Sequence, residues 1–191
     1  MTASFVATMA WWLFIASWWA ASWWVAKASV TAPRGKRILY FVGFAIGFGA
    51  LFAANHSDPD HRAGWLLWRN PAAVDGLLLA GQIAAFAFAW WARVHLGTLW
   101  SSMLTLREGH TVVDTGPYRL ARHPIYTGFI AASWCYALIE THPLALFGAV
   151  VLTIVMTVKA KEEERFLRQE LGAADYDAYA QRTRMLLPLP K

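Results

Sequence analysis

Five long apolar runs constrain the fold of this chain more than any other feature of its sequence. They cover residues 5–26, 38–54, 74–92, 125–139 and 144–158. A helix needs about 20 apolar residues to cross the roughly 30 Å hydrocarbon layer of a membrane, and the first run meets that length without a charged residue. That run is longer than the apolar core of a signal peptide, and no basic side chain precedes it. The runs predict an all-α integral membrane protein with five transmembrane helices.

The composition agrees with this prediction. Hydrophobic residues make up 58% of the chain and charged residues 15%, whereas a soluble domain is about half apolar and roughly a quarter charged. So apolar a chain is not an intrinsically disordered one. We therefore expect the lipid bilayer to be its main partner.

The last two runs are predicted to form a short helical hairpin. Each has about 15 residues, or roughly 22 Å of helix, and only Glu140, Thr141, His142 and Pro143 separate them. Proline suits the first turn of a helix, so Pro143 is expected to open the returning one. Helices this short are expected to thin the bilayer locally or to shelter against the longer spans.

The basic residues predict the orientation in the membrane. With five spans, fifteen of the 17 Lys and Arg fall on one side, and only Arg62 and Arg69 fall on the other. Because basic loops stay in the cytoplasm, the N-terminus is expected outside and the C-terminus inside, in the inner membrane if the chain is bacterial. This distribution explains the net charge of +5 without a nucleic acid partner, and we expect none.

Several classes of cofactor site are not expected. The single cysteine, Cys135, excludes a disulfide framework and a zinc site built from cysteines. None of the six histidines lies in a predicted span, where a membrane haem protein would place its axial ligands. The chain also lacks a strand, glycine-rich turn and helix in the order of a dinucleotide site. No metal site is predicted.

Two features of the spans leave alternatives open. The spacing of Gly43 and Gly47 allows another helix to approach closely, either within the chain or in a dimer, so the oligomeric state stays open. The first run also holds six tryptophans, which either pack against lipid and neighbouring helices or stack on a substrate. These tryptophans are Trp11, Trp12, Trp18, Trp19, Trp23 and Trp24.

Two polar segments lie on the predicted cytoplasmic side. The segment 93–123 is too long for a simple connector and has a turn signal at Gly116-Pro117. The tail is expected to continue the fifth helix, with Lys159, Glu163 and Phe166 on one face. Gly172 is a predicted helix C-cap and Asp175 the N-cap of a last short helix.

A motif in two parts covers roughly residues 93–188, half of the chain. The parts read His110-Thr-Val-Val-x-x-Gly116-Pro-Tyr118-x-x-x-Arg122-His123-Pro124-x-Tyr126-x-Gly128, and then Glu163-Glu164-x-x-Leu167, Gly172 and Tyr176-x-x-Tyr179. The combination resembles the isoprenylcysteine carboxyl methyltransferases and their prokaryotic relatives, which share the pattern with the phospholipid N-methyltransferases.

The resemblance implies a membrane-embedded enzyme that uses S-adenosylmethionine and releases S-adenosylhomocysteine. It implies one domain, with a three-helix membrane part at 1–92 and a cofactor-binding core at 93–191, where the cytoplasmic loop and C-terminal helices form the site. The cofactor contacts that it implies are His110, Thr111, Val112, Val113, Tyr118, His123, Pro124, Ile125, Tyr126 and Glu163.

Two basic residues are assigned to the reaction. Lys159 takes the place of an arginine that faces the substrate in the eukaryotic enzymes, so the resemblance makes it a catalytic and substrate-binding residue. Lysine keeps the charge but loses the bidentate fork of arginine. Arg122 is predicted to be catalytic as well, since it can position an anionic acceptor. The alternative for Arg122 is a contact with lipid phosphates, and for Tyr118, Tyr126 and Tyr179 an anchoring role at the interface.

The expected acceptor is a lipophilic or small molecule. A prenylcysteine-like carboxylate is the first expectation, and a phospholipid amine or a small thiol is the alternative. A non-catalytic membrane scaffold or sensor with the same fold is the alternative from a different class.

Overall fold

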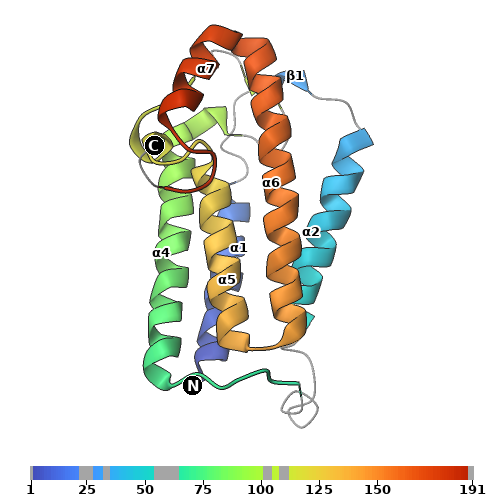
Figure 1. Ribbon diagram of the computed structural model, residues 1–191, viewed down its shortest axis with the longest axis vertical. Helices are drawn as coiled ribbons and strands as arrows, with labels where there is room; N and C mark the ends of the chain where they lie inside the picture. The colour runs from blue at the N-terminus through green and yellow to red at the C-terminus, as the bar shows by residue number, and fades with distance from the viewer. Residues whose placement is uncertain are drawn as a thin grey trace.

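Each of the five predicted apolar runs contains a long helix within the part of the chain that the structure describes. The computed structural model describes residues 2–21, 28–31, 35–53, 65–100, 105–107 and 112–188. Its long helices are α1 (Ala3–Ala20), α2 (Gly35–Ala53), α4 (Ala72–Leu96), α5 (Pro124–Glu140) and α6 (Pro143–Leu171). They lie side by side in one bundle, and the shorter α7 (Ala173–Arg182) crosses one end of it, opposite the N-terminus (Figure 1).

Three of these helices are long and apolar enough to cross a membrane. They span Ala3–Ala20, Ala72–Leu99 and Pro143–Glu170, while α2 has a shorter apolar part, Ile38–Ala53. Large apolar side chains point outward from the bundle, among them Leu13, Phe41 and Leu77, each more than 70% exposed. So much exposed apolar surface is typical of a protein that faces lipid. The chain is therefore a membrane protein.

The helical hairpin forms as predicted, but its second arm is longer. Thr141 ends α5 in the left-handed region at φ 51°, and its N–H donates to the carbonyl of Ala137. The side chain of His142 accepts from the N–H of Leu144, and Pro143 occupies the first turn of α6. Helix α6 is 29 residues long, because its helical backbone continues through the charged residues after Val158. Helix α6 is thus longer than the short arm that the apolar run 144–158 predicted, and the prediction that the tail continues this helix is confirmed.

Two of the four described tryptophans of the first helix, Trp11 and Trp18, pack within the bundle, whereas Trp12 and Trp19 are exposed. Trp11 is fully buried at the centre of the bundle, and its ring meets Phe86 edge-on at 4.8 Å between centroids. It also contacts Phe48 and Phe52 of α2, at 5.7 and 5.8 Å. Trp23 and Trp24 lie outside the described residues.

Gly43 and Gly47 of α2 serve a contact within the chain. A Cβ atom at Gly43 would lie 2.6 Å from the side chain of Val155, and one at Gly47 would lie 2.7 Å from Leu152. Both partners belong to α6, where Gly148 in turn faces the backbone of α2 at Leu51. The small residues thus let α2 and α6 approach each other closely.

This close approach predicts the effect of a methyl group at Gly148. Its Cβ would lie 2.5 Å from the backbone nitrogen of Leu51, and backbone atoms cannot move aside cheaply. We expect Gly148→Ala to destabilise the protein by about 1–3 kcal/mol, measured as a lower Tm in detergent. Gly49→Ala is the matched control, because no atom lies within 4 Å of its Cβ. Equal Tm values for the two variants would contradict the packing of α2 on α6.

Two local features differ from the predictions. The fold prediction named only helices, but β1 (Ala28–Thr31) pairs antiparallel with β2 (Thr105–Arg107) and joins two polar segments. Asp175 is not an N-cap, because α7 begins at Ala173. Gly172 caps both helices instead, with φ at 100°, a value that glycine adopts easily.

Candidate active site

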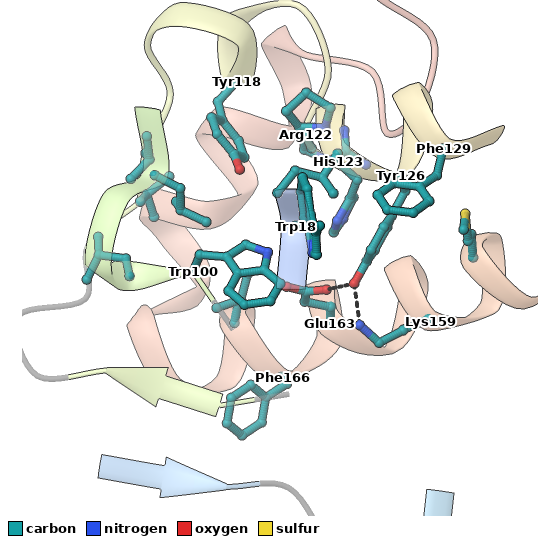
Figure 2. Close-up of a pocket in the computed structure, with 18 of the residues that line it drawn as sticks. Trp18, Trp100, Tyr118, Arg122, His123, Tyr126, Phe129, Lys159, Glu163 and Phe166 are labelled. Atoms are coloured by element: carbon teal, nitrogen blue, oxygen red, sulfur yellow. Dashed lines mark hydrogen bonds between the residues drawn. The ribbon is translucent and has the colours of Figure 1, made fainter. Parts of the chain in front are cut away.

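A cavity of about 490 Å³ lies at the end of the bundle that α7 crosses, and Figure 2 shows side chains that line it. Walls come from α1, α2, α5, α6, α7 and the segment before α5. It brings together all the predicted site residues that the structure describes, which are Val112, Val113, Tyr118, Arg122, His123, Pro124, Ile125, Tyr126, Lys159 and Glu163. The remaining two, His110 and Thr111, lie outside the described residues.

Two helices position the polar side chains of the cavity. His123 is the N-cap of α5 with Pro124 in the first turn, so the chain turns into the helix there and Tyr126 points inward. On α6, Lys159 and Glu163 lie four positions apart in the sequence, and both line the cavity. The prediction that they share one helix face is confirmed.

These side chains form a hydrogen-bonded chain around the hydroxyl of Tyr126. That hydroxyl donates to Oε2 of Glu163 at 2.7 Å and accepts from Nζ of Lys159 at 2.5 Å (Figure 2). The Lys159 side chain is only 8% exposed. The tyrosine thus lies between a cation and a carboxylate, which fixes both side chains at the cavity wall.

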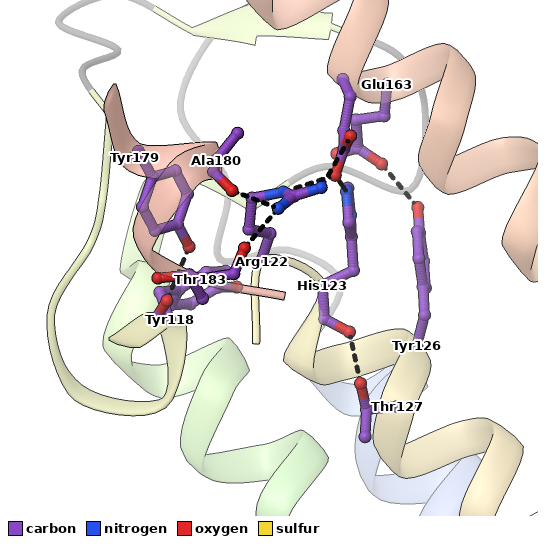
Figure 3. Close-up of polar contacts among 10 residues, drawn as sticks. Tyr118, Arg122, His123, Tyr126, Thr127, Glu163, Tyr179, Ala180 and Thr183 are labelled. Carbon is purple, nitrogen blue, oxygen red and sulfur yellow. Dashed lines mark hydrogen bonds and ion pairs between the residues drawn. The ribbon is translucent and has the colours of Figure 1, made fainter. Parts of the chain in front are cut away.

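Arg122 makes contacts of a different kind. Its Nε and Nη2 donate to the two carboxylate oxygens of Glu164, at 2.7 and 3.1 Å. Its Nη1 donates to the carbonyls of Ala180, at 3.1 Å, and Thr183 (Figure 3). Burial lowers the pKa of Arg122, but the hydrogen bond and charge of Glu164 outweigh burial and hold it above its usual value. The charge of Arg122 is therefore paired with Glu164, whereas the sequence predicted a contact between Arg122 and the acceptor.

Glu164 is a site residue to which the sequence analysis gave no role. Besides pairing with Arg122, Glu164 contacts His123, whose Nε2 lies 3.3 Å from Oε1 of Glu164. Three consecutive glutamates precede Arg165, and a solvated face with helical ion pairs is the common reading of such a run. The structure separates the roles of two of them: Glu163 contacts Tyr126, and Glu164 pairs with Arg122.

The C-terminal segment is fastened to this site. The backbone N–H groups of Arg122 and His123 donate to the carbonyls of Arg184 and Met185, at 2.9 and 3.0 Å. The hydroxyl of Tyr179 donates to the carbonyl of Tyr118 at 2.6 Å (Figure 3). Burial raises the pKa of both tyrosines, so their hydroxyls stay protonated. Both side chains are buried here, which contradicts a role as anchors at the membrane surface.

The contacts of Arg122 predict a loss of stability when they are removed. We expect Arg122→Gln to lower the free energy of unfolding by about 1–2 kcal/mol, because it breaks a half-buried ion pair and two hydrogen bonds. The measurements are Tm in detergent and the rate of proteolysis after the C-terminal arginines. Arg119→Gln is the control, since Arg119 is exposed. A variant as stable as the wild type but slow in methyl transfer would instead place Arg122 at the acceptor.

An apolar cleft of about 550 Å³ adjoins the cavity. It lies between α1, α2 and α5 and is lined by aromatic rings, including Trp12, Phe14 and Phe52. Four of its residues also line the cavity, namely Trp18, Trp19, Phe48 and Phe129. The cavity and this aromatic cleft therefore adjoin each other and share a wall of four aromatic side chains.

Residues 77–169 match the model of the isoprenylcysteine carboxyl methyltransferase (ICMT) family. This segment belongs to the ICMT family. The ICMT segment covers α5 and nearly all of α6, and so it includes the hairpin and the Tyr126, Lys159 and Glu163 cluster.

Curated relatives carry several names. A methanethiol S-methyltransferase 1 of Bradyrhizobium diazoefficiens is 36% identical over 58% of this chain and 42% of its own length. The nickel-cobalt-cadmium resistance protein NccN of Alcaligenes xylosoxydans is 28% identical over 49% of the chain and 44% of its length. A probable protein-S-isoprenylcysteine O-methyltransferase of Oryza sativa is 35% identical over 42% of each. The chain thus spans less than half the length of these relatives.

Among the described residues, no group of three or more His, Cys, Asp or Glu side chains is arranged to hold a metal ion.

Proposed function

We propose that this chain is an integral membrane methyltransferase that uses S-adenosylmethionine to methylate a lipophilic acceptor, with a prenylcysteine-like carboxylate as the acceptor group. One observation carries the proposal: the polar cluster of Tyr126, Lys159 and Glu163 lines a cavity that adjoins an aromatic cleft among lipid-facing helices. A polar cofactor and a membrane-dissolved acceptor can meet at such a place.

The cavity fits the cofactor in size and chemistry. Ligand pockets typically measure about 300–1,000 Å³ and combine apolar walls with a few polar groups. The carboxylate of Glu163 can accept hydrogen bonds from ribose hydroxyls or balance a sulfonium charge, and Tyr118 offers a ring as a wall. The residues that would hold the cofactor are Val112, Val113, Tyr118, His123, Pro124, Ile125, Tyr126 and Glu163, together with His110 and Thr111.

When bound, S-adenosylmethionine supplies a methyl group for in-line displacement by the acceptor. The protein then has to align the two reactants and exclude water. Lys159 donates one of its three protons to Tyr126, which leaves two for an anionic acceptor group. The apolar walls of the cavity, such as Phe129 and Met156, keep water from the reacting atoms. A carboxylate acceptor needs no general base.

Arg122 has a positioning role in this proposal. It holds Glu164 and the carbonyls of the C-terminal segment, so that α7 and the start of α5 stay packed around the cavity. This positioning role replaces the direct contact with the acceptor that the charge of Arg122 suggested.

Methylation of a small thiol is the second candidate function. The name of the Bradyrhizobium relative supports it, because that protein is called a methanethiol S-methyltransferase. A thiolate, like a carboxylate, carries the negative charge that Lys159 suits. The aromatic cleft favours the larger acceptor, since methanethiol would leave it unused.

The test has two steps. S-adenosylhomocysteine is titrated into the detergent-purified protein, and saturable binding is expected. Methyl transfer from S-adenosylmethionine is then measured to N-acetyl-S-farnesyl-L-cysteine, to methanethiol and to phosphatidylethanolamine. Failure to bind S-adenosylhomocysteine would refute the proposal. Binding without transfer to any of the three acceptors would favour a sensor.

The proposal extends to the topology. We propose five spans, including the shorter α2 and α5, with the N-terminus outside and the site at the cytoplasmic end. The N-terminus and α7 lie at opposite ends of the bundle (Figure 1), and α7 contributes to the wall of the cavity, which supports this arrangement. A reporter fused before Met1 should be accessible from outside, and one fused after Lys191 only from inside. The reverse pattern would place the cavity on the outer face.

A further inference from the structure

A buried arginine, Arg93, lies behind the aromatic wall of the cavity, in the last turn of α4. It is only 2% exposed. Its guanidinium carbon is 3.6 Å from the ring centroid of Trp100 and 4.7 Å from that of Trp18, and Trp90 follows at 5.9 Å. Its Nη2 donates to the carbonyl of Ala21 at 2.6 Å. The guanidinium is therefore held between indole rings.

In this setting, the stabilisation of the Arg93 charge depends on the indole rings. Its Nε and Nη1 have no hydrogen-bond partner in the part of the chain that the structure describes. A buried charge without a paired carboxylate is costly. Two effects offset the cost here: the negative ends of α1 and α4, where the Ala21 carbonyl and Arg93 itself lie, and the electron-rich faces of the tryptophans. The same attraction fixes the orientation of the rings.

The two nearest rings belong to the wall where the cavity adjoins the aromatic cleft, so a passage between the two spaces would run beside them. Trp100 lines the cavity, and Trp18 lines both spaces. Their rings meet edge-on at 5.7 Å between centroids, and Trp18 also meets Phe129 at 5.4 Å, again edge-on. Across the cavity lie Glu163 and Tyr126 (Figure 2). Rotation of either indole would change the width of this passage.

We propose that Arg93 is a positioning residue that determines acceptor selection: by clamping Trp18 and Trp100, it sets the width of the passage between the aromatic cleft and the polar cavity. The inference rests on the proposed function, because it assumes that the acceptor reaches the cavity through the cleft. Arg93 itself touches neither reactant. It acts through the two rings, and the cofactor contacts around Glu163 are independent of it.

The test uses Arg93→Met, which keeps an extended apolar side chain and removes the charge, with Arg165→Met as the control at an exposed arginine. The proteins carry 5-fluorotryptophan, and the fluorine signals of Trp18 and Trp100 are assigned by single replacements with Phe. N-acetyl-S-farnesyl-L-cysteine and S-adenosylhomocysteine are then titrated separately in detergent. We expect Arg93→Met to shift the signals of Trp18 and Trp100 and to leave those of Trp65 and Trp68 unchanged.

The two affinities are expected to separate. Loss of the cation–π contacts should raise the Kd of the farnesyl probe about tenfold and change that of S-adenosylhomocysteine less than about twofold. Arg93→Lys should fall between, since it keeps the charge without the planar stacking. In the Trp100→Phe background, Arg93→Met should have a smaller effect, because the two residues act through one contact. A purely structural role would weaken both ligands equally and would be additive with Trp100→Phe.

Three outcomes would overturn the inference. They are equal loss of both affinities, unchanged binding of the probe in Arg93→Met, and a wild-type protein that binds S-adenosylhomocysteine while the probe leaves the Trp18 and Trp100 signals unmoved. In the last case the methyltransferase proposal stands and only the passage is refuted. A wild-type protein that fails to bind S-adenosylhomocysteine refutes the proposed function instead, and unmoved Trp18 and Trp100 signals in Arg93→Met would then refute the clamp by themselves.

Discussion

Glu163→Ala is expected to weaken the binding of S-adenosylhomocysteine by about a hundredfold, because a hydrogen bond to a charged group contributes about 1.5–3 kcal/mol. The carboxylate lines the cavity and is held in place by the hydroxyl of Tyr126. The variant also removes the acceptor for that hydroxyl, which frees the tyrosine ring to move. Isothermal titration of the purified protein in detergent measures the change.

Glu170→Ala is the matched control for this experiment. Glu170 lies on the same helix two turns further on and is exposed, so its replacement should leave the affinity unchanged. Glu163→Gln separates charge from shape, since it keeps one carbonyl oxygen for the tyrosine. If Glu163→Ala binds S-adenosylhomocysteine as tightly as Glu170→Ala does, the cofactor lies elsewhere and the assignment of the cavity is wrong.

Lys159→Ala should lower the rate of methyl transfer by about a hundredfold or more, while the affinity for S-adenosylhomocysteine changes less than about twofold. The ammonium group donates to Tyr126 and has two further protons available for an anionic acceptor. Its loss removes the group that aligns the acceptor, and alignment is the main contribution that a protein makes to such a displacement. Initial rates at saturating S-adenosylmethionine provide the measurement.

Lys161→Ala is the control, because Lys161 is exposed only two residues away on the same helix. Lys159→Arg tests the departure from the eukaryotic pattern: the guanidinium offers a fork for a carboxylate and should favour carboxylate acceptors over thiols. Equal losses of cofactor affinity and turnover in Lys159→Ala would assign Lys159 to the cofactor side of the cavity.

The helices and the hairpin could be predicted because their signals are local. An uncharged run of residues predicts α1. Pro143, directly after the N-cap His142, predicts the start of α6. Hydropathy alone ends the predicted fifth span at residue 158, and the helical spacing of Lys159, Glu163 and Phe166 predicts its continuation into the tail. Hydrogen bonds of the helix continue past Val158, where the side chains turn from apolar to charged and line a polar cavity.

The partners of Arg122 and Arg93 could not be predicted from the sequence, since each depends on segments that are distant along the chain. Arg122 finds Glu164 and the carbonyl of Thr183, which only the docking of α7 brings near. Arg93 stood at the end of a span, where a basic residue usually marks the cytoplasmic side. Its enclosure by Trp18 and Trp100 follows from the packing of α1 against α4.

Helix α6 is one continuous helix that passes through two different environments. Its first half packs through Leu152 and Val155 against α2, and its second half carries Lys159 and Glu163. A change in bilayer thickness alters the tilt of such a helix without altering its internal spacing. The cation and the carboxylate therefore move together, as a fixed pair, whereas Tyr126 moves with α5. The hydrogen bonds of Tyr126 with Lys159 and Glu163 therefore join the two helices at the cavity.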